Sequence, residues 1–321
     1  MSNKIKQEIN KIEIPNELSQ RSKLGISEAK KEMKINNKRF KVKGIAVAAA
    51  ILISIGTLLF LNNNFNTNDM VNNQKKVVTK HGGIKIPAIQ LPKGNTAADM
   101  IGLIVYNRKI YTQTRTEIDA ENAKAILGKK LGNTKGNIDE WSNQKDYDKE
   151  FASTTGIADV YSVKGYDKDF RIMTYGELDG KPYAQFYENL NGITIHNGKD
   201  VFGKLKMLGN VTKAQYRTAN DWDNNIQNYH SIIDMKIVNA FVEELNGTKQ
   251  FLRGENSDPI ANPKSNDNFS ELTITLKDGS KVRLLLLKGG YIYYGFMGAY
   301  FKMDDKVFSE LWKRIQIYPS L

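Results

Sequence analysis

The chain contains no cysteine and only three histidines, His81, His196 and His230, among its 321 residues. Without cysteine it forms no disulfide, holds no thiolate metal site and has no thiol nucleophile. The histidines stand far apart in the sequence, and the H-E-x-x-H, G-x-S-x-G and phosphate-loop patterns are absent. The sequence therefore predicts no cofactor, no metal site and no catalytic residue, and we expect the protein not to be an enzyme.

Two weaker patterns in the sequence each have a structural explanation. Asp221, Asp223 and Asn225 imitate the start of a calcium loop, but the loop's glycine and its final glutamate are missing, which favours a solvated loop. A second group of aromatic residues is able either to line a ligand groove or to cover a sheet, and its strand-like spacing favours the sheet. This group comprises Tyr291, Tyr293, Tyr294, Phe296, Tyr300 and Phe301.

Positive charge exceeds negative charge in this chain, and the excess is unevenly placed. Residues 1–43 carry twelve Lys or Arg against five Glu, a balance of +7 within a total net charge of +12. A protein that binds nucleic acid directly is expected to spread its basic residues over a folded face. Here the excess lies in a short tail beside an apolar segment, which favours a lipid bilayer over nucleic acid as the partner.

The apolar segment, residues 44–61, reads GIAVAAAILISIGTLLFL and has no charged residue among its eighteen. A helix of this length spans ~27 Å, close to the ~30 Å hydrocarbon core of a bilayer. A cleaved signal peptide has a shorter leading region and a small-residue cleavage site, whereas forty-three residues precede this segment. The sequence therefore predicts one transmembrane helix at residues 44–61.

The basic residues that flank this segment predict its orientation. Lys38, Arg39, Lys41 and Lys43 precede it, and no Lys or Arg follows until Lys75. Because positive residues are retained on the cytoplasmic side, we expect the N-terminus in the cytoplasm and the C-terminal part outside the cell membrane.

The tail, residues 1–43, is too short to bury a core but has apolar stripes at helical spacing. Pro15 and Gly25 interrupt these stripes. An amphipathic helix lying on anionic lipid gains from continuity, so the interruptions favour short helices that fold on a cytoplasmic protein. The residues predicted to contact that partner are Ile14, Pro15, Leu18, Leu24, Ile26 and Met33.

A family resemblance enters at the stretch KIEIPNELSQRSKLGISEAKKEMK, residues 11–34, which precedes a basic run and the apolar segment. This region resembles the N-terminus of Gram-positive membrane anti-sigma factors, and the layout is similar to negative effectors of extracytoplasmic-function sigma factors in Bacillus-like bacteria. The resemblance implies that the tail holds such a sigma factor at the membrane and releases it on an outside stimulus, often through proteolysis. Many of these proteins carry a His and Cys zinc site in this region, and this tail has neither residue, so sigma binding here would be free of zinc.

Beyond the segment, residues 62–82 are rich in Asn and Lys and are typical of a linker. We expect two α+β lobes with antiparallel sheets after it, over residues 83–229 and 230–321. Strands are predicted at residues 84–86, 101–105, 159–163, 170–175, 183–187 and 291–294, with a turn at Asp179-Gly180. Helices are predicted from Asp119 to Gly132, over residues 237–245 and from Asp304.

One hairpin is specified in detail. Pairing Ile274 with Val282 and Leu272 with Leu284 requires a three-residue loop, Lys277-Asp278-Gly279, with Gly279 in the left-handed position. A two-residue loop would place apolar residues opposite charged ones. Residues 284–287 are apolar on both faces, which predicts a covered central strand.

The leading hypothesis is therefore an anti-sigma factor whose outer domain senses an unknown extracytoplasmic ligand or is cut by a protease. The alternative is a membrane-anchored binding or scaffold protein of the cell envelope without a role in transcription. An extracytoplasmic enzyme is the least favoured of the three, because the sequence singles out no catalytic pair.

Overall fold

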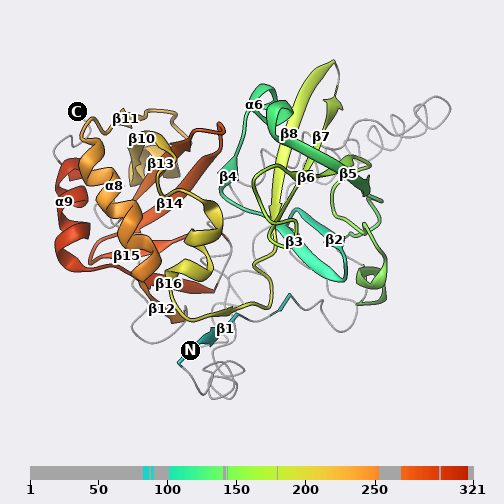
Figure 1. The fold of residues 1–321 in the computed structure, drawn as a ribbon, viewed down its shortest axis with the longest axis horizontal. Helices are drawn as coiled ribbons and strands as arrows, with labels where there is room; N and C mark the ends of the chain where they lie inside the picture. The colour runs from blue at the N-terminus through green and yellow to red at the C-terminus, as the bar shows by residue number, and fades with distance from the viewer. Residues whose placement is uncertain are drawn as a thin grey trace, which may run out of the picture. The chain divides into compact units, whose positions relative to one another are not determined.

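The computed structural model describes residues 82–86, 88–89, 101–139, 142, 144–178, 180–252, 269–295 and 298–316. They form an α+β fold built on antiparallel sheets, as the sequence predicted (Figure 1). The tail, the apolar segment at 44–61 and nearly all of the predicted linker lie outside the described residues. None of the helices within the described ranges is long and apolar enough to cross a membrane.

The first large sheet has six strands in the order β2-β3-β8-β7-β6-β5, all antiparallel to their neighbours. β2 and β3 are joined at Asn107 and Arg108, whose φ angles of 50° and 58° are those of a type I′ turn. β7 and β8 pair up to Leu178 and Lys181, so the connection lies at the predicted turn position. The strands are β2 (Leu103–Tyr106), β3 (Lys109–Gln113), β5 (Leu127–Asn133), β6 (Asp159–Val163), β7 (Arg171–Leu178) and β8 (Lys181–Glu188).

The helix predicted from Asp119 to Gly132 is wrong in its second half. α6 (Ala120–Ile126) begins after Asp119, but the next residues form β5 and pair with β6. Two glycines of β5 allow side chains of neighbouring segments to lie close to its backbone. A Cβ on Gly128 would lie 2.3 Å from Ser162 Oγ, and one on Gly132 would lie 2.3 Å from the Phe151 ring. The chain thus uses these glycines to bring β5 against its neighbours, where spacing alone suggested a continuing helix.

The second large sheet has eight strands. Seven follow the order β11-β10-β13-β14-β15-β16-β12, and β4 pairs with β14 beside them. Two helices, α8 (Met235–Glu244) and α9 (Asp305–Gln316), cover one face of this sheet (Figure 1). The strands are β4 (Thr116–Glu117), β10 (Val211–Thr218), β11 (His230–Ser231), β12 (Lys249–Leu252), β13 (Phe269–Leu276), β14 (Lys281–Leu287), β15 (Tyr291–Tyr293) and β16 (Ala299–Lys302).

The predicted hairpin is confirmed as β13 and β14. Ile274 pairs with Val282 and Leu272 with Leu284, and Gly279 has φ +84°. β14 is also covered on both faces. Leu284 and Leu286 join the core beneath the helices, while Leu285 and Leu287 pack with aromatic residues on the opposite face.

The two large sheets share one extended segment. Residues 109–113 pair within the six-stranded sheet, residues 116–117 pair with β14, and only Thr114 and Arg115 lie between. β10 and β4 come from the sequence before residue 230 and yet belong to the eight-stranded sheet. That sheet therefore takes strands from both sides of the boundary predicted between residues 229 and 230.

The strand predicted at 84–86 forms the short β1 (Ile84–Lys85), which pairs with β9 (Thr194–Ile195). Ile84 and Ile86 are buried in the same core as α8 and α9, and Gln250 Nε2 donates to Gly82 O at 2.9 Å. The chain is thus fixed to the eight-stranded sheet at the end of the predicted linker. The remaining short helices are α7 (Ala219–Asp223), η1 (Gln144–Asp148), η2 (Gly198–Asp200), η3 (Phe202–Leu205) and η4 (Leu245–Gly247).

Candidate functional site

The partner-binding and topology residues predicted from the sequence all lie outside the described residues. They are Ile14, Pro15, Leu18, Leu24, Ile26, Met33, Lys38, Arg39, Lys41 and Lys43. Their roles remain predictions. The described part of the chain instead presents two buried glutamates, each held by arginine.

Glu188, the last residue of β8, has a fully buried carboxylate. Its Oε1 accepts hydrogen bonds from Arg171 Nε at 3.0 Å and Arg171 Nη2 at 2.5 Å. Its Oε2 accepts a 2.5 Å hydrogen bond from the hydroxyl of Tyr294, which follows β15 in the other large sheet. Charge-assisted bonds of this kind are short and strong, so they hold the two sheets together through a single carboxylate.

The Tyr294 hydroxyl also meets the segment that the two sheets share. It lies 2.6 Å from Thr116 Oγ1 and 3.2 Å from Thr114 Oγ1, and Tyr294 and Thr116 are both fully buried. Burial, together with the negative charge of Glu188, raises the pKa of Tyr294 well above its usual value. The phenol therefore keeps its proton and acts as a hydrogen-bond donor.

Arg171 is enclosed by aromatic rings. Its guanidinium carbon lies 4.2 Å from the Tyr166 ring centroid and 4.7 Å from that of Phe186. Burial works most strongly to lower the pKa of Arg171, but Glu188, Tyr166 and Tyr294 together outweigh it and the net shift of the pKa is upward. Tyr166 extends the network to the β13–β14 hairpin, because its hydroxyl donates to Asp278 Oδ2 at 2.8 Å. We call Arg171, Glu188, Tyr294, Thr114 and Thr116 the sheet junction.

The second glutamate, Glu271 on β13, is also fully buried. Its Oε1 accepts from Arg217 Nε at 2.8 Å, and its Oε2 accepts from Trp222 Nε1 at 3.1 Å and lies 3.6 Å from Arg115 Nη1. Burial lowers the pKa of Arg115 despite the neighbouring Glu271. These residues lie on the face of the eight-stranded sheet opposite α8 and α9.

Arginine side chains outnumber carboxylates in the surroundings of Glu271. Arg283, next to Arg115 along the sheet, pairs with Glu117 at 2.6 Å, and both side chains reach solvent. Three guanidinium groups thus face two carboxylates, whereas the sheet junction holds one of each. We call Arg115, Arg217, Trp222 and Glu271 the arginine face.

Neither glutamate has the setting of an acid–base catalyst. General acid–base catalysis requires a group that reaches substrate, and both carboxylates are fully buried with each oxygen engaged by donors. Within the described residues, no group of three or more His, Asp or Glu side chains is arranged to hold a metal ion. The hydrogen bonds of Glu188 and Glu271 instead couple neighbouring strands to each other.

The other residues singled out from the sequence are separated in the fold. His196 lies on the surface beside Asp200, and His230 stacks on Tyr216; His81 lies outside the described residues. Asp221 and Asp223 belong to α7 and Asn225 follows the C-cap of that helix, so the first part of the calcium-like pattern is a short helix rather than the expected solvated loop. Asp221 is buried and accepts a hydrogen bond from Thr218 Oγ1. The described aromatic residues of the 291–301 segment cover the sheet as expected, since Tyr293, Tyr294, Tyr300 and Phe301 are buried on its two faces.

The sequence carries a pairing signal for both glutamates. A two-residue connection after Leu178 pairs Arg171 directly with Glu188, so the predicted turn already specified this opposite-charge pair. Arg217 and Glu271 are likewise directly opposite in β10 and β13. Finding that second pair required β10, for which no strand was predicted.

Comparison of this chain with known protein families, with curated proteins and with solved structures finds no match. The functional conclusion rests on the residues of the chain itself.

Proposed function

We propose that the chain is a membrane-bound anti-sigma factor, a negative effector of an extracytoplasmic-function sigma factor. In this proposal residues 1–43 hold the sigma factor in the cytoplasm, and residues 44–61 cross the cell membrane once. The two sheets then form an extracytoplasmic domain that receives the signal. The observation that carries the proposal is the N-terminal layout: the stretch at 11–34, the basic run after it and the uncharged segment of eighteen residues.

The described domain supports a receiving role through its connections. β1 enters the core of the eight-stranded sheet directly after the predicted linker. The shared segment at 109–117 and the sheet junction link that sheet to the six-stranded one. A packed interior transmits a displacement rather than absorbing it, so a change at either sheet reaches the point where the chain leaves toward the membrane.

The first test is capture of a sigma factor by the full-length protein. The tagged chain is purified from membranes in detergent, and bound proteins are identified by mass spectrometry. We expect the wild type to retain a sigma factor and the double variant Leu18→Asp, Ile26→Asp to lose it, because both changes put a charge on the predicted apolar contact. A matched control is Ser19→Asp, Ser27→Asp, which adds the same charge to neighbouring polar positions; aspartate remains a good helix cap at residue 27.

Capture by neither the wild type nor the control would overturn the anti-sigma proposal. The chain would then be treated as a membrane-anchored binding or scaffold protein of the cell envelope. Equal capture by all three proteins would keep the function but remove Leu18 and Ile26 from the contact surface.

The second test concerns topology and exploits the absence of cysteine, since any introduced thiol is the only one in the chain. Ser22→Cys places a thiol in the tail, and Lys181→Cys places one at an exposed position in the outer domain. A maleimide that does not cross membranes is expected to label the second variant in intact cells and the first only after lysis. Labelling of Ser22→Cys in intact cells would reverse the proposed orientation.

A further inference from the structure

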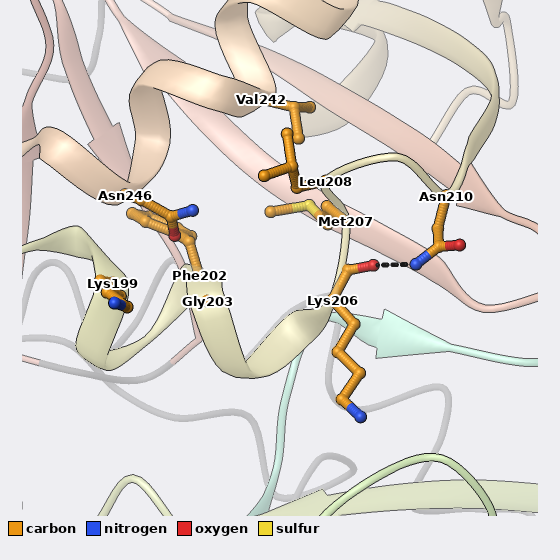
Figure 2. A pocket seen from close by; sticks show the side chains of 9 residues that line it. All are labelled: Lys199, Phe202, Gly203, Lys206, Met207, Leu208, Asn210, Val242 and Asn246. Atoms are coloured by element: carbon orange, nitrogen blue, oxygen red, sulfur yellow. Dashed lines mark hydrogen bonds between the residues drawn. The ribbon is translucent and has the colours of Figure 1, made fainter.

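A pocket of about 340 Å³ is lined by residues of η2, η3, the turn that follows η3, the end of α8 and η4, and none of these residues belongs to the sheet junction or the arginine face (Figure 2). The turn is fixed by two hydrogen bonds, from Asn210 Nδ2 to Lys206 O and from Asn210 N to Met207 O, each 2.9 Å long. The pocket is lined by Lys199, Phe202, Gly203, Lys206, Met207, Leu208, Asn210, Val242 and Asn246.

The floor of the pocket is apolar. Phe202, Met207 and Val242 belong to the core and are almost completely buried, while the Leu208 side chain is 57% exposed at the rim. Figure 2 shows Leu208, Met207 and Val242 close together, with Asn246 on the other side of the pocket and its amide oxygen turned toward η3. An apolar floor with a small number of polar groups at its edge is typical of sites for small ligands, and this volume is at the lower end of their range.

Two polar groups at the edge have no partner in the described part of the chain. Asn246 Oδ1 is buried and accepts no hydrogen bond there. The Lys199 ammonium makes no ion pair with any described residue, whereas the Lys206 ammonium is directed to Gly165 O and the Tyr166 ring. A buried acceptor without a donor is costly, so a ligand that donates to Asn246 Oδ1 would remove that cost.

Gly203 lies next to both of these groups. A Cβ on residue 203 would lie 3.1 Å from Lys199 Cγ and 3.4 Å from Asn246 Oδ1, so it would occupy the space between them. Gly203 does not have a positive φ, so its backbone does not itself require glycine. The missing side chain thus leaves room beside an acceptor and a cation.

We propose that this pocket binds the C-terminal residue of a peptide that ends in an apolar side chain. The backbone N–H of that residue donates to Asn246 Oδ1, its free carboxylate pairs with Lys199 Nζ, and its side chain packs on Phe202, Met207, Leu208 and Val242. The volume admits one or two residues. This ligand class is independent of sigma-factor binding by the tail, and the anti-sigma proposal stands or fails separately.

The test uses the full chain in lipid nanodiscs, because detergent would compete for the apolar floor. The probe is N-acetyl-L-leucine, and its binding is followed by saturation-transfer NMR and titration calorimetry. N-acetyl-L-leucinamide, which lacks the carboxylate, is expected to bind about tenfold more weakly, the equivalent of one charge-assisted contact. This comparison needs no mutation and so does not depend on how a variant folds.

Three variants assign the contacts. Lys199→Met is expected to abolish the preference for the acid over the amide, and Asn246→Leu to weaken both ligands. Gly203→Ala is expected to weaken N-acetyl-L-leucine about tenfold or more by filling the pocket, whereas Gly156→Ala, which adds a methyl group to open space, is the matched control. Absence of binding would overturn the proposal. It would also be overturned if N-acetyl-L-leucine and N-acetyl-L-leucinamide bind with equal affinity and Gly203→Ala leaves that affinity unchanged.

Discussion

The sheet junction and the arginine face contain the same kinds of residue and differ in their ratio of arginine to glutamate. Each has a fully buried glutamate, an arginine directly opposite it on the neighbouring strand, and an aromatic side chain that donates a hydrogen bond to the second oxygen. At the junction one arginine meets one glutamate, and both side chains are completely enclosed. On the arginine face Glu271 is shared by Arg217 and Arg115, which keep 6% and 12% of their side-chain surface exposed.

This difference determines what each site contributes. A charge taken wholly out of water depends on its partner, because no solvent replaces the interaction. A charge at a partly open edge is able to turn toward water when its partner is lost. The junction therefore fixes the two sheets to each other, whereas the arginine face keeps a surplus of positive charge that the fold tolerates.

The largest effect is expected from Glu188→Ala, which leaves Arg171 charged and unpaired in the interior. We expect the free energy of unfolding to fall by about 3–5 kcal/mol, measured by denaturant unfolding of the full chain with tryptophan fluorescence. The matched control is Arg171→Met, Glu188→Leu, which removes both charges and should recover much of the loss. If the double variant is as unstable as Glu188→Ala, the loss comes from packing rather than from the unpaired charge.

The burial of tyrosine in the six-stranded sheet leads us to expect that the free energy of unfolding falls at alkaline pH. Burial raises the pKa of Tyr187, which lies on β8 next to Glu188, to about 12, against about 10 for the unfolded chain. Because the folded pKa is the higher one, this contribution is complete below pH 10 and is lost as the pH rises toward 12, by about 3 kcal/mol. Unfolding free energies measured between these values should fall less steeply for Tyr187→Phe than for the wild type. Parallel slopes for the two proteins would contradict the assignment.

Removing the carboxylate of Glu271 tests the arginine face in the same way that Glu188→Ala tests the sheet junction. Glu271→Ala should lower the free energy of unfolding by about 2 kcal/mol, less than Glu188→Ala, because the side chains of Arg115 and Arg217 keep 12% and 6% of their surface exposed, whereas Arg171 is fully enclosed. The fluorescence of Trp222, whose indole N–H donates to Glu271, should change in the folded protein. A loss equal to that of Glu188→Ala would show that the arginine face is as enclosed as the junction, and the comparison between the two sites would fail.

The sequence predicted the parts of this fold in which local pattern and pairing agree. Apolar alternation and one glycine were enough to specify the register of β13 and β14, because only the three-residue loop places apolar residues opposite each other. The helix after Asp119 was predicted too long, since Leu127 and Leu131 keep helical spacing while Gly128 and Gly132 serve a sheet contact with distant residues.

Long-range organisation was beyond local patterns. The strand β4 is two residues long and has meaning only because it pairs with β14, more than 160 residues later. The sheet junction depends on the same contact, which brings Thr116 to Tyr294. The pocket residue Asn246 directly follows the helix predicted over residues 237–245, and only the fold shows that its side-chain oxygen is buried without a donor among the described residues.

The smallest effect is expected at the rim of the arginine face, with Glu117→Gln. Arg283 and Glu117 are 2.6 Å apart, but their side chains are 25% and 46% exposed, and water screens such pairs. We expect a loss below about 1 kcal/mol that shrinks further when salt is added. The matched control is Asp119→Asn, which removes the partner of Lys281 in a second exposed pair on the same strand. Similar small decreases in the free energy of unfolding for both variants would support the view that water screens the charges at the rim of the arginine face. If Glu117→Gln lowers the free energy of unfolding as much as Glu271→Ala does, Arg283 depends on Glu117 for its stabilisation. The excess positive charge of the arginine face would then be stabilised by this carboxylate rather than by water.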